Sequence, residues 1–544
     1  MNKKLLVIPM LGIVIPTLSA CGKKSGTIDD PTKANLHVLT LDKGIGTKWL
    51  ENAAAIFNEM YAESEDFQQG RKGVKVSIIG DTKLDGAYLN TAVLNDDIYF
   101  TEQVDYRDLV NKGKLLDITD VLKADLSFYG DEEGKTILSK IDPTMESYMN
   151  MNNKYYGVPF YDSFYGFVYD VTLWKENNLY LSNDPEDPFV PYDDANISVG
   201  SDNIAGTPDD GLPATYEEFG LLMDELNQRG ITPFITADIA KEYVADYLYN
   251  VVADYEGVNQ MVLNLTLNGT ATDLIDTVDN NGNITYKPAT QITQSNGYLL
   301  TRQAGRYSGL NFLKNYIMTL PNGQASGYRF VDTHTTAQRQ FVQKNVGSRP
   351  DVGMIIEGSW WENEAASIIA TEAEKSGRRD FAIMPIPFAS KEKAIESNYK
   401  HTYLSLSQSF GVISSKCSNV KLAKEFMKFL HCDKMLSKFT ADTSITRPLN
   451  YEVTSQDQSK LSNYAKSLIY LKQHSNIVYP YSSLPVMVNN PSDFKHYYFV
   501  WKSDVDGTPY NHPWDYLREG SKNPTIKKYF DGHYDHYYNR WPNL

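Results

Sequence analysis

Two adjacent tryptophans are the residues of this sequence whose type and spacing most directly suggest chemistry. Trp360 and Trp361 stand behind a glycine and a serine in the stretch EGSWWENEAA, residues 357–366. Large aromatic rings either fill a core or offer a flat surface on which a ligand can stack. Which role each ring takes depends on the elements that position it.

A strand followed by a helix is the arrangement that the neighbouring residues predict. The apolar run VGMII, residues 352–356, is typical of a buried strand. Ser359 and Glu362 have the spacing of a capping box, so Glu357 and Gly358 would form the turn between strand and helix. Open α/β sheets bind ligands at the carboxyl ends of their strands. We therefore expect the rings to divide, with one in the core and one facing a crevice.

Strands and a helix alternate in the N-terminal part of the chain. Residues 35–41, 74–80 and 96–100 have the composition of strands, and apolar residues recur at helical spacing over residues 49–60. This alternation predicts a parallel α/β construction.

Two long stretches, residues 180–213 and 262–296, look inserted into this pattern. The second contains DTVDNNGNITYK, which predicts a hairpin with an Asn-Gly turn. Between the insertions, Thr215 and Glu218 form a capping box for a helix that Gly230 ends.

The N-terminus has the layout of a secretion signal. Two lysines precede a 14-residue apolar run, residues 5–18, which is too short to span a bilayer comfortably. The sequence LSAC that follows resembles a bacterial lipobox. That resemblance implies that residues 1–20 are removed and that Cys21 carries the lipid, with residues 21–34 as a flexible tether. The alternative is an ordinary secretion signal with a chance cysteine.

Composition and charge argue against several classes of protein. The 544 residues exceed one ordinary domain and suggest two or three domains or two lobes. The net charge is −16 and no basic run occurs beyond the N-terminus, so nucleic acid is not an expected partner. Cys417 and Cys432 flank a predicted helix whose ends are about 18 Å apart, too far for a disulfide. No CxxC or HExxH pattern indicates zinc.

The chain resembles the extracellular solute-binding proteins of the carbohydrate type, the receptors of ABC importers. The resemblance runs from about residue 36 to 450 and consists of seven segments in the family's order. They are LTLDKGIGTKWLENAAAIFNEMY with VKVSII, DDIYFTEQVDYRDLVNKGKLLDITDVL, KYYGVPFYDSFYGFVYD, LPATYEEFGLLMDEL, VGMIIEGSWWENEA with FAIMPIP, FGVISSKCSNVKLAKEFMKFL, and TSITRPLN.

This resemblance implies an α/β fold of two lobes, joined by crossing strands, that close on a ligand. The first lobe would comprise residues 35–160 and 408–445, and the second residues 161–407 and 446–544. The family's single tryptophan, two places after the glycine, aligns with Trp360, which makes it the expected ligand-facing ring.

The family's ligand cleft corresponds to positions of this sequence that carry aromatic, charged and amide side chains. A sugar needs flat rings for its C–H faces and polar groups for its hydroxyls. By resemblance the binding residues are Asp42 and Lys43 after the first strand, Glu102 and Gln103 after the third, Tyr161, Asp162, Phe164 and Tyr165 in the first crossover, Glu357, Gly358, Trp360 and Trp361 in the turn, and Arg447 in the last crossover.

Structural roles are the alternatives at these positions. Asp42 could cap the next helix, and Glu102 and Gln103 could be solvated loop residues. Phe164 and Tyr165 could pack inside a lobe. Arg447 could belong to an ion pair.

The stretch SDNIAGTPDDG in the first insertion offers hard oxygen ligands of the kind that Ca²⁺ prefers. The candidates are Asp202, Asn203, Asp209 and Asp210. Their spacing is not that of an EF-hand loop, so we expect a solvated acidic loop and no resident metal or other cofactor.

The resemblance thus implies a lipid-anchored, monomeric binding protein that captures a sugar, of oligosaccharide size, by closing its cleft. It would hand the sugar to the permease subunits of an ABC importer. A lipid-anchored glycoside hydrolase or lyase is one alternative, although no catalytic motif is visible. A receptor for another solute on the same fold is a second alternative.

Overall fold

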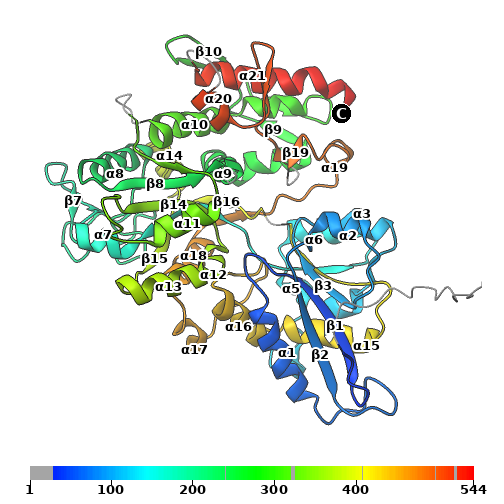
Figure 1. The fold of residues 1–544 in the computed structure, drawn as a ribbon. Coiled ribbons are helices and arrows are strands. Elements are labelled where there is room, and N and C mark those ends of the chain that lie inside the picture. The colour runs from blue at the N-terminus through cyan, green and yellow to red at the C-terminus, as the bar shows by residue number, and fades with distance from the viewer. Residues whose placement is uncertain (1–27, 239–240, 320–324, 407, 496–497, 520–523) are drawn as a thin grey trace, which may run out of the picture.

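The computed structural model describes residues 28–238, 241–319, 325–406, 408–495, 498–519 and 524–544. The predicted signal peptide and Cys21 lie outside these residues. The chain forms two α/β lobes, each around a five-stranded sheet (Figure 1). Among the described residues, no helix is long and apolar enough to cross a membrane.

The sheet of the first lobe has the strand order β2-β1-β3-β17-β4. Its strands are β1 (Ala34–Leu41), β2 (Val74–Asp81), β3 (Ile98–Thr101), β17 (Phe410–Ile413) and β4 (Gly157–Pro159). β1 pairs in parallel with β2 and β3, whereas β17 is antiparallel to both of its neighbours. All eight residues of β1 are buried. The three N-terminal strands, and the helix α1 (Lys48–Met60) between β1 and β2, confirm the sequence prediction.

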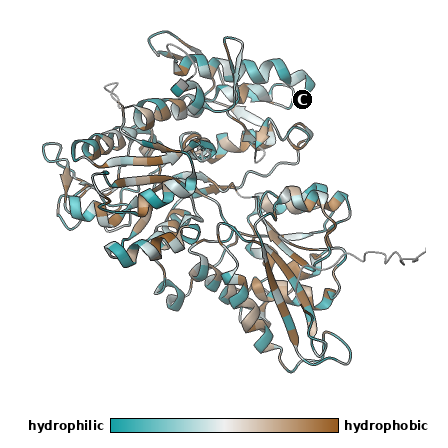
Figure 2. Cartoon of the chain, viewed as in Figure 1, coloured by the Kyte–Doolittle hydropathy of each residue, from teal (hydrophilic) through white to brown (hydrophobic). Residues whose placement is uncertain are grey.

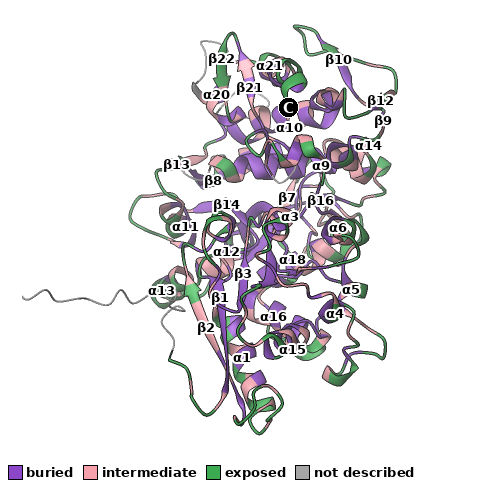
Figure 3. Cartoon of the chain, turned by 90° about the vertical axis from the view of Figure 1, so that its right-hand side faces the viewer, coloured by how far each residue is buried: buried purple, intermediate pink, exposed green. Residues whose placement is uncertain are grey.

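The sheet of the second lobe has the order β13-β8-β14-β5-β15. Its strands are β13 (Arg329–Val331), β8 (Thr232–Ala237), β14 (Val352–Gly358), β5 (Tyr165–Asp170) and β15 (Phe381–Met384). The long helix α9 (Lys241–Thr266) and helix α11 (His334–Val342) pack on this sheet. The inner strands of both sheets are apolar and buried, whereas the edge strands β2 and β13 are largely half-buried (Figures 2 and 3).

The strand-to-helix turn after β14 differs from its prediction. Glu357 and Gly358 are the last residues of the strand and not a turn. Ser359 does not cap the helix that follows, because its hydroxyl donates to the carbonyl of Asp162, 3.0 Å away. Glu362 instead accepts hydrogen bonds from two serine hydroxyls. The short helix α12 (Trp361–Glu364) therefore begins without a side-chain cap, and α13 (Ala366–Ser376) continues from it.

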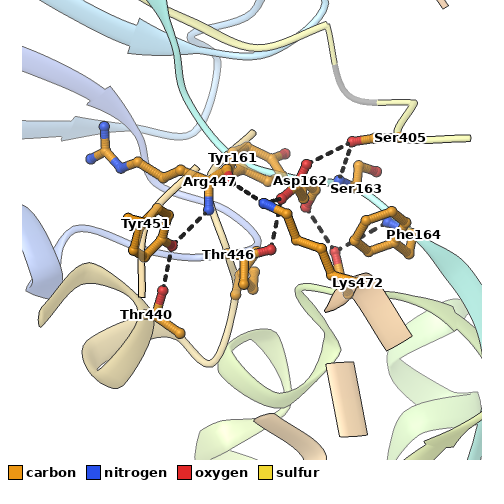
Figure 4. Close-up of polar contacts among 12 residues, drawn as sticks. Tyr161, Asp162, Ser163, Phe164, Ser405, Thr440, Thr446, Arg447, Tyr451 and Lys472 are labelled. Atoms are coloured by element: carbon orange, nitrogen blue, oxygen red, sulfur yellow. Dashed lines mark hydrogen bonds and ion pairs between the residues drawn. The ribbon is translucent and has the colours of Figure 1, made fainter. Parts of the chain in front are cut away.

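Three segments cross between the lobes side by side, and we call them the hinge. They are residues 160–164, residues 405–406 with 408–409, and residues 445–448. Backbone hydrogen bonds join them: Phe160 N donates to Ser409 O, Leu406 N to Ser163 O, and Asp162 N to Thr446 O, at 2.9–3.0 Å. Figure 4 shows the side chains that meet there.

The second insertion and the C-terminal tail form one unit on top of the second lobe (Figure 1). The predicted hairpin is present as β10 (Ile275–Val278) and β11 (Ile284–Tyr286), beside the pair β9 (Gly269–Ala271) and β12 (Thr290–Ile292). The tail helix α21 (Ile526–Arg540) packs against this region. Trp541 Nε1 donates to the carbonyl of Gln294 at 2.8 Å. A separate apolar cluster buries residues from both segments.

Helix α8 (Tyr216–Gln228) begins and ends almost as its sequence predicts. Thr215 accepts from the Glu218 backbone, but the Glu218 carboxylate accepts from Ala214 rather than from Thr215, so only half of the capping box forms.

The remaining elements are α2 (Gly86–Thr91), α3 (Tyr106–Asn111), α4 (Thr119–Leu122), α5 (Ile137–Lys140), α6 (Pro143–Met149), α7 (Val171–Asn177), β6 (Tyr180–Leu181), β7 (Phe189–Val190), α10 (Ala304–Phe312), α14 (Lys391–Glu396), β16 (Thr402–Leu404), α15 (Val420–Leu430), α16 (Asp433–Thr443), α17 (Ser455–Gln458), α18 (Asn463–His474), β18 (Asn476–Val478), α19 (Pro485–Val488), β19 (Phe494–Lys495), β20 (Tyr498–Phe499), β21 (Ser503–Val505), β22 (Thr508–Tyr510) and α20 (Pro513–Glu519).

Candidate ligand-binding site

Three aromatic rings gather at the carboxyl end of β14. Trp360 meets Tyr165 edge-on, with ring centroids 5.3 Å apart, and Tyr243 at 6.0 Å. β14 pairs antiparallel with β5, and this register sets Gly358 opposite Tyr165. Tyr243 comes from the first turn of α9. We call these three residues the aromatic cluster.

The glycine before the tryptophans has a steric role in this cluster. A Cβ added to Gly358 would lie 2.3–2.5 Å from carbons of the Trp360 ring, so the ring lies directly over the glycine. Only a residue without a side chain permits this close approach. The turn thereby fixes where the Trp360 ring lies.

The aromatic cluster lies where the two lobes meet. A Cβ added to Gly44, in the loop after β1 of the first lobe, would lie 3.4 Å from Cβ and Cγ of Trp360. Trp360 is therefore 9% exposed, although it stands at the end of a strand. The neighbouring residues Asp42 and Lys43 are exposed. Asp42 does not cap α1, because the residue before that helix is Thr47.

A carboxylate from the first lobe joins the site beside the aromatic cluster. Glu102 follows β3, and the Tyr161 hydroxyl donates to its Oε2 at 2.5 Å. Burial raises the pKa of the Glu102 carboxyl, while that hydrogen bond and the charge of Lys43 lower it in part. Gln103 turns into solvent with a positive φ of 55°. Of this pair, Glu102 is thus the one that the structure places at the site.

A second carboxyl, Glu357, is almost completely buried in the second lobe, with 1% exposed. Its Oε1 accepts from Gln338 Nε2 at 3.1 Å, and the same amide donates to Glu364 at 2.8 Å. Burial, and then the charge of Glu364, raise the pKa of Glu357 to about 8. Glu357 therefore keeps its proton at neutral pH.

Trp361 is a core residue. It is fully buried and contacts Phe341, Phe381 and Tyr464 with ring centroids 5.0–5.6 Å apart. The two tryptophans thus divide between core and lobe interface, and the expectation that Trp361 faces a ligand is contradicted. Phe164 is likewise buried, edge-on to Tyr403 at 6.2 Å, and packs in the interior.

Asp162 holds the hinge together and does not face a ligand (Figure 4). Its carboxylate is fully buried. It forms an ion pair with Lys472 at 2.7 Å and accepts from the hydroxyls of Thr446, Ser405 and Tyr479 at 2.6–3.3 Å. These four donors occupy both carboxylate oxygens, which corrects the expectation that Asp162 binds the ligand.

Arg447 is also turned inward, away from any ligand. It has no exposed surface and stacks over Phe439 and Trp49 at 4.3 and 4.9 Å. Its Nη1 lies 2.8 Å from His431 Nε2. Burial lowers the pKa of the guanidinium to about 9. Among the described residues no carboxylate pairs with Arg447; aromatic rings and an imidazole pack around it instead, so its buried side chain does not face a ligand.

The calcium candidates direct their oxygens at the protein itself. Asp209 Oδ2 accepts from the backbone and hydroxyl of Ser201 and from the Asp202 backbone, at 2.8–3.2 Å. Asp210 accepts from Gly206, and Asn203 has a positive φ of 58°. Within the described ranges, no three His, Cys, Asp or Glu residues come together as a metal would require. Both described cysteines are free, as predicted.

A pocket of about 710 Å³ opens beside the hinge, away from the aromatic cluster. It is bounded by the start of α6, the end of α18 and the segment after the last crossing, and its lining includes Asp142, Tyr451, Lys472 and Tyr479. Both lobes contribute walls, so a change in the angle between the lobes must change its volume.

Three residues of the site have no counterpart among the sequence predictions, namely Tyr243, Gln338 and Glu364. Tyr243 stands in the first turn of α9, and Gln338 lies mid-helix in α11. Glu364 is seven residues after Glu357, and its place beside the tryptophans was the available signal. The other two come from segments with no recognised motif.

Comparison with known proteins gives the family. Residues 48–431 match the model of the bacterial extracellular solute-binding proteins. No curated protein matches the chain. Among solved structures, the GacH receptor of Streptomyces glaucescens is 12% identical with a TM-score of 0.51, and the match covers 94% of this chain and 99% of that one. RafE of Streptococcus pneumoniae is 13% identical (TM-score 0.52, coverage 94% and 99%).

A third solved structure, the cyclic α-maltosyl-1,6-maltose binding protein of Arthrobacter globiformis, is 11% identical with a TM-score of 0.52 and covers 94% and 100% of the two chains. At these identities the likeness establishes the shared two-lobed fold. Because the family model spans more than half of the sequence, the chain belongs to the bacterial extracellular solute-binding proteins.

Proposed function

We propose that this protein captures a sugar, of oligosaccharide size, between its lobes and delivers it to an ABC importer. The observation that carries the proposal is the aromatic cluster of Trp360, Tyr165 and Tyr243, set against the first lobe at Gly44. The solved relatives include a receptor bound to acarbose, one bound to raffinose and one named for a cyclic maltosyl-maltose.

The side chains at this site suit the two kinds of surface that a sugar ring presents. Aromatic faces stack on the apolar C–H faces, and carboxylates accept hydrogen bonds from hydroxyls. Glu102 approaches from the first lobe, whereas Glu364 and Trp360 come from the second. A sugar that contacts both sets stabilises the closed arrangement of the lobes, since a ligand favours the state to which it binds more tightly.

Delivery requires that the protein stay close to its importer. We propose that Cys21 carries lipid and tethers the protein outside the cytoplasmic membrane, with the permease subunits as its partner. The support is the LSAC sequence after a short apolar run. Known members of the family are binding proteins, and we propose binding without catalysis here as well.

A thermal-shift screen against mono- and oligosaccharides tests the sugar proposal. A ligand that binds only the folded state stabilises it by RT ln(1 + [L]/Kd), so binding raises the melting temperature. We expect at least one oligosaccharide to raise it in a concentration-dependent way. The Trp360→Ala variant should lose that response. If amino acids or peptides raise the melting temperature and no sugar does, the protein is a receptor for another solute.

A further inference from the structure

The site between the lobes has more acidic than basic side chains. Burial raises the pKa of the Tyr243 hydroxyl, and negative charge on Glu357, Glu364, Glu102 and Asp246 raises it further. Four carboxyls therefore act electrostatically on one ring of the aromatic cluster, and Asp246 among them is paired with Lys495. Lys43, from the first lobe, is the basic side chain that acts on Glu102. By contrast, no positively charged side chain among the described residues acts on the pKa of Glu357.

Glu357 also has an oxygen that the protein leaves unused. Its side chain is 1% exposed, yet its Oε2 makes no hydrogen bond within the described part of the chain. A buried polar atom without a partner costs about 1–3 kcal/mol, so native structures rarely keep one without a reason. The neighbouring Glu364 is only partly buried and shares the single amide of Gln338 with it.

We propose that the sugar bound at this site carries a positively charged nitrogen, as amino sugars do, which is held by Glu357 and Glu364 beside the aromatic cluster. This inference rests on the proposed function and specifies its ligand. An ammonium group offers three donors, enough for both carboxylates. Aromatic rings attract cations through their faces, so Trp360 and Tyr243 favour the same charge.

A neutral sugar would satisfy this site less well. Two adjacent carboxyls that share one amide repel each other when both are ionised, and one must stay protonated. A bound ammonium replaces that proton and allows both carboxylates to ionise. The groups facing Glu357 are Gln338 from α11, Glu364 from α12, Tyr243 from α9 and Tyr464 from α18.

Matched saccharides separate an amine from a hydroxyl on the same backbone. β-1,4-linked glucosamine oligomers, their N-acetylated forms and cello-oligosaccharides differ only at C2. Glucosamine, galactosamine and mannosamine, with their N-acetyl and hydroxyl counterparts, extend the panel to other configurations. We expect an amine member to give the largest thermal shift and, by calorimetry, to bind at least about tenfold more tightly than its N-acetyl form.

Variants then assign the preference to particular side chains. Glu357→Gln and Glu364→Gln should each weaken amine binding by about tenfold or more and lower the ratio of amine to hydroxyl affinity for the same saccharide. Glu364 is partly exposed, so its variant remains informative even if Glu357→Gln folds poorly. Glu362→Gln is the matched control, because serine hydroxyls hold that carboxylate and the amine preference should persist.

Proton release gives a readout independent of affinity. Calorimetry with glucosamine at pH 6, where its amine is already ionised and Glu357 still holds its proton, should show about one proton released per sugar bound when phosphate and Bis-Tris buffers are compared, and none in Glu357→Gln. Tighter binding of a neutral or N-acetylated sugar would overturn this inference and leave the sugar-binding function intact. An amine preference that survives both Glu→Gln variants would also overturn it. If no saccharide in this panel binds but another sugar in the thermal-shift screen does, the inference fails alone; if no sugar binds in either, the proposed function fails with it.

Discussion

Replacing Trp360 and Trp361 one at a time should separate ligand binding from folding. Trp361 is fully buried among Phe341, Phe381 and Tyr464. Removing a core tryptophan costs about 3–5 kcal/mol of stability. We therefore expect Trp361→Ala to unfold at a clearly lower denaturant concentration and, where folded, to bind its sugar as the parent protein does.

Trp360→Ala should have the opposite profile. Its side chain packs against Tyr165 and Tyr243 and also against the Gly44 loop of the other lobe, so part of its packing exists only where the lobes meet. Truncating a central aromatic anchor commonly costs about 2 kcal/mol or more of binding energy. That corresponds to roughly thirtyfold in affinity. Its stability loss should be smaller than that of Trp361→Ala.

Both variants need the same two measurements. Calorimetric titration with the best sugar from the thermal-shift screen gives affinity, and a urea melt gives the free energy of unfolding. Trp360→Phe serves as a control, because it keeps an aromatic face and should retain most of the affinity. Wild-type affinity in Trp360→Ala would refute the stacking role of this ring.

Four further outcomes follow from the sequence and the structure. Mass spectrometry of the native protein should find a lipid-modified N-terminus at Cys21, and Cys21→Ser should release the protein from membranes. Purified protein should leave its bound oligosaccharide intact over long incubation, as checked by chromatography; steady production of shorter sugars would favour the hydrolase alternative. Glu357 has a folded-state pKa of about 8 against an ordinary 4.5, so between these values the unfolded chain binds fewer protons and stability falls as pH rises. Urea melts should show that, between pH 5 and pH 8, the free energy of unfolding falls less in Glu357→Gln than in the parent protein, with a difference of up to about 4 kcal/mol. Lys472→Met should destabilise the protein by about 3–5 kcal/mol, because it leaves Asp162 charged and buried; an unchanged melt would show that the hydroxyl donors suffice.

Local patterns carried most of the fold prediction. Strands such as β1 and helices such as α1 are visible in the sequence because a buried run and a 3.6-residue period are properties of a few consecutive residues. Ser359 shows the limit of this reasoning. Its spacing to Glu362 is that of a capping box, but its hydroxyl donates to the Asp162 carbonyl, almost 200 residues away in sequence. A tertiary contact therefore took the place of the local one.

The hinge shows why position along the chain does not decide which residues face a ligand. Asp162 and Arg447 stand in crossing segments, and Asp162 directly follows Tyr161, which reaches the site, yet both side chains turn inward. Asp162 forms an ion pair with Lys472 and accepts hydrogen bonds from hydroxyls of three other segments. Arg447 packs among aromatic rings of the first lobe. Consecutive residues of an extended segment alternate in direction. A shift of one position thus exchanges a ligand-facing side chain for a structural one.

Antiparallel pairing explains why the site could be located but not completed from the sequence. Gly358 lies opposite Tyr165 because β14 and β5 pair, although 193 residues of chain separate them. The pairing brings Tyr165 to Trp360, and the packing of α9 and α11 on the same sheet brings Tyr243 and Gln338. Neither helix has a motif that indicates a ligand. Both helices join the site because they pack near the carboxyl end of β14. There Gly358 leaves room for the Trp360 ring, and Oε2 of the buried Glu357 makes no hydrogen bond within the described residues.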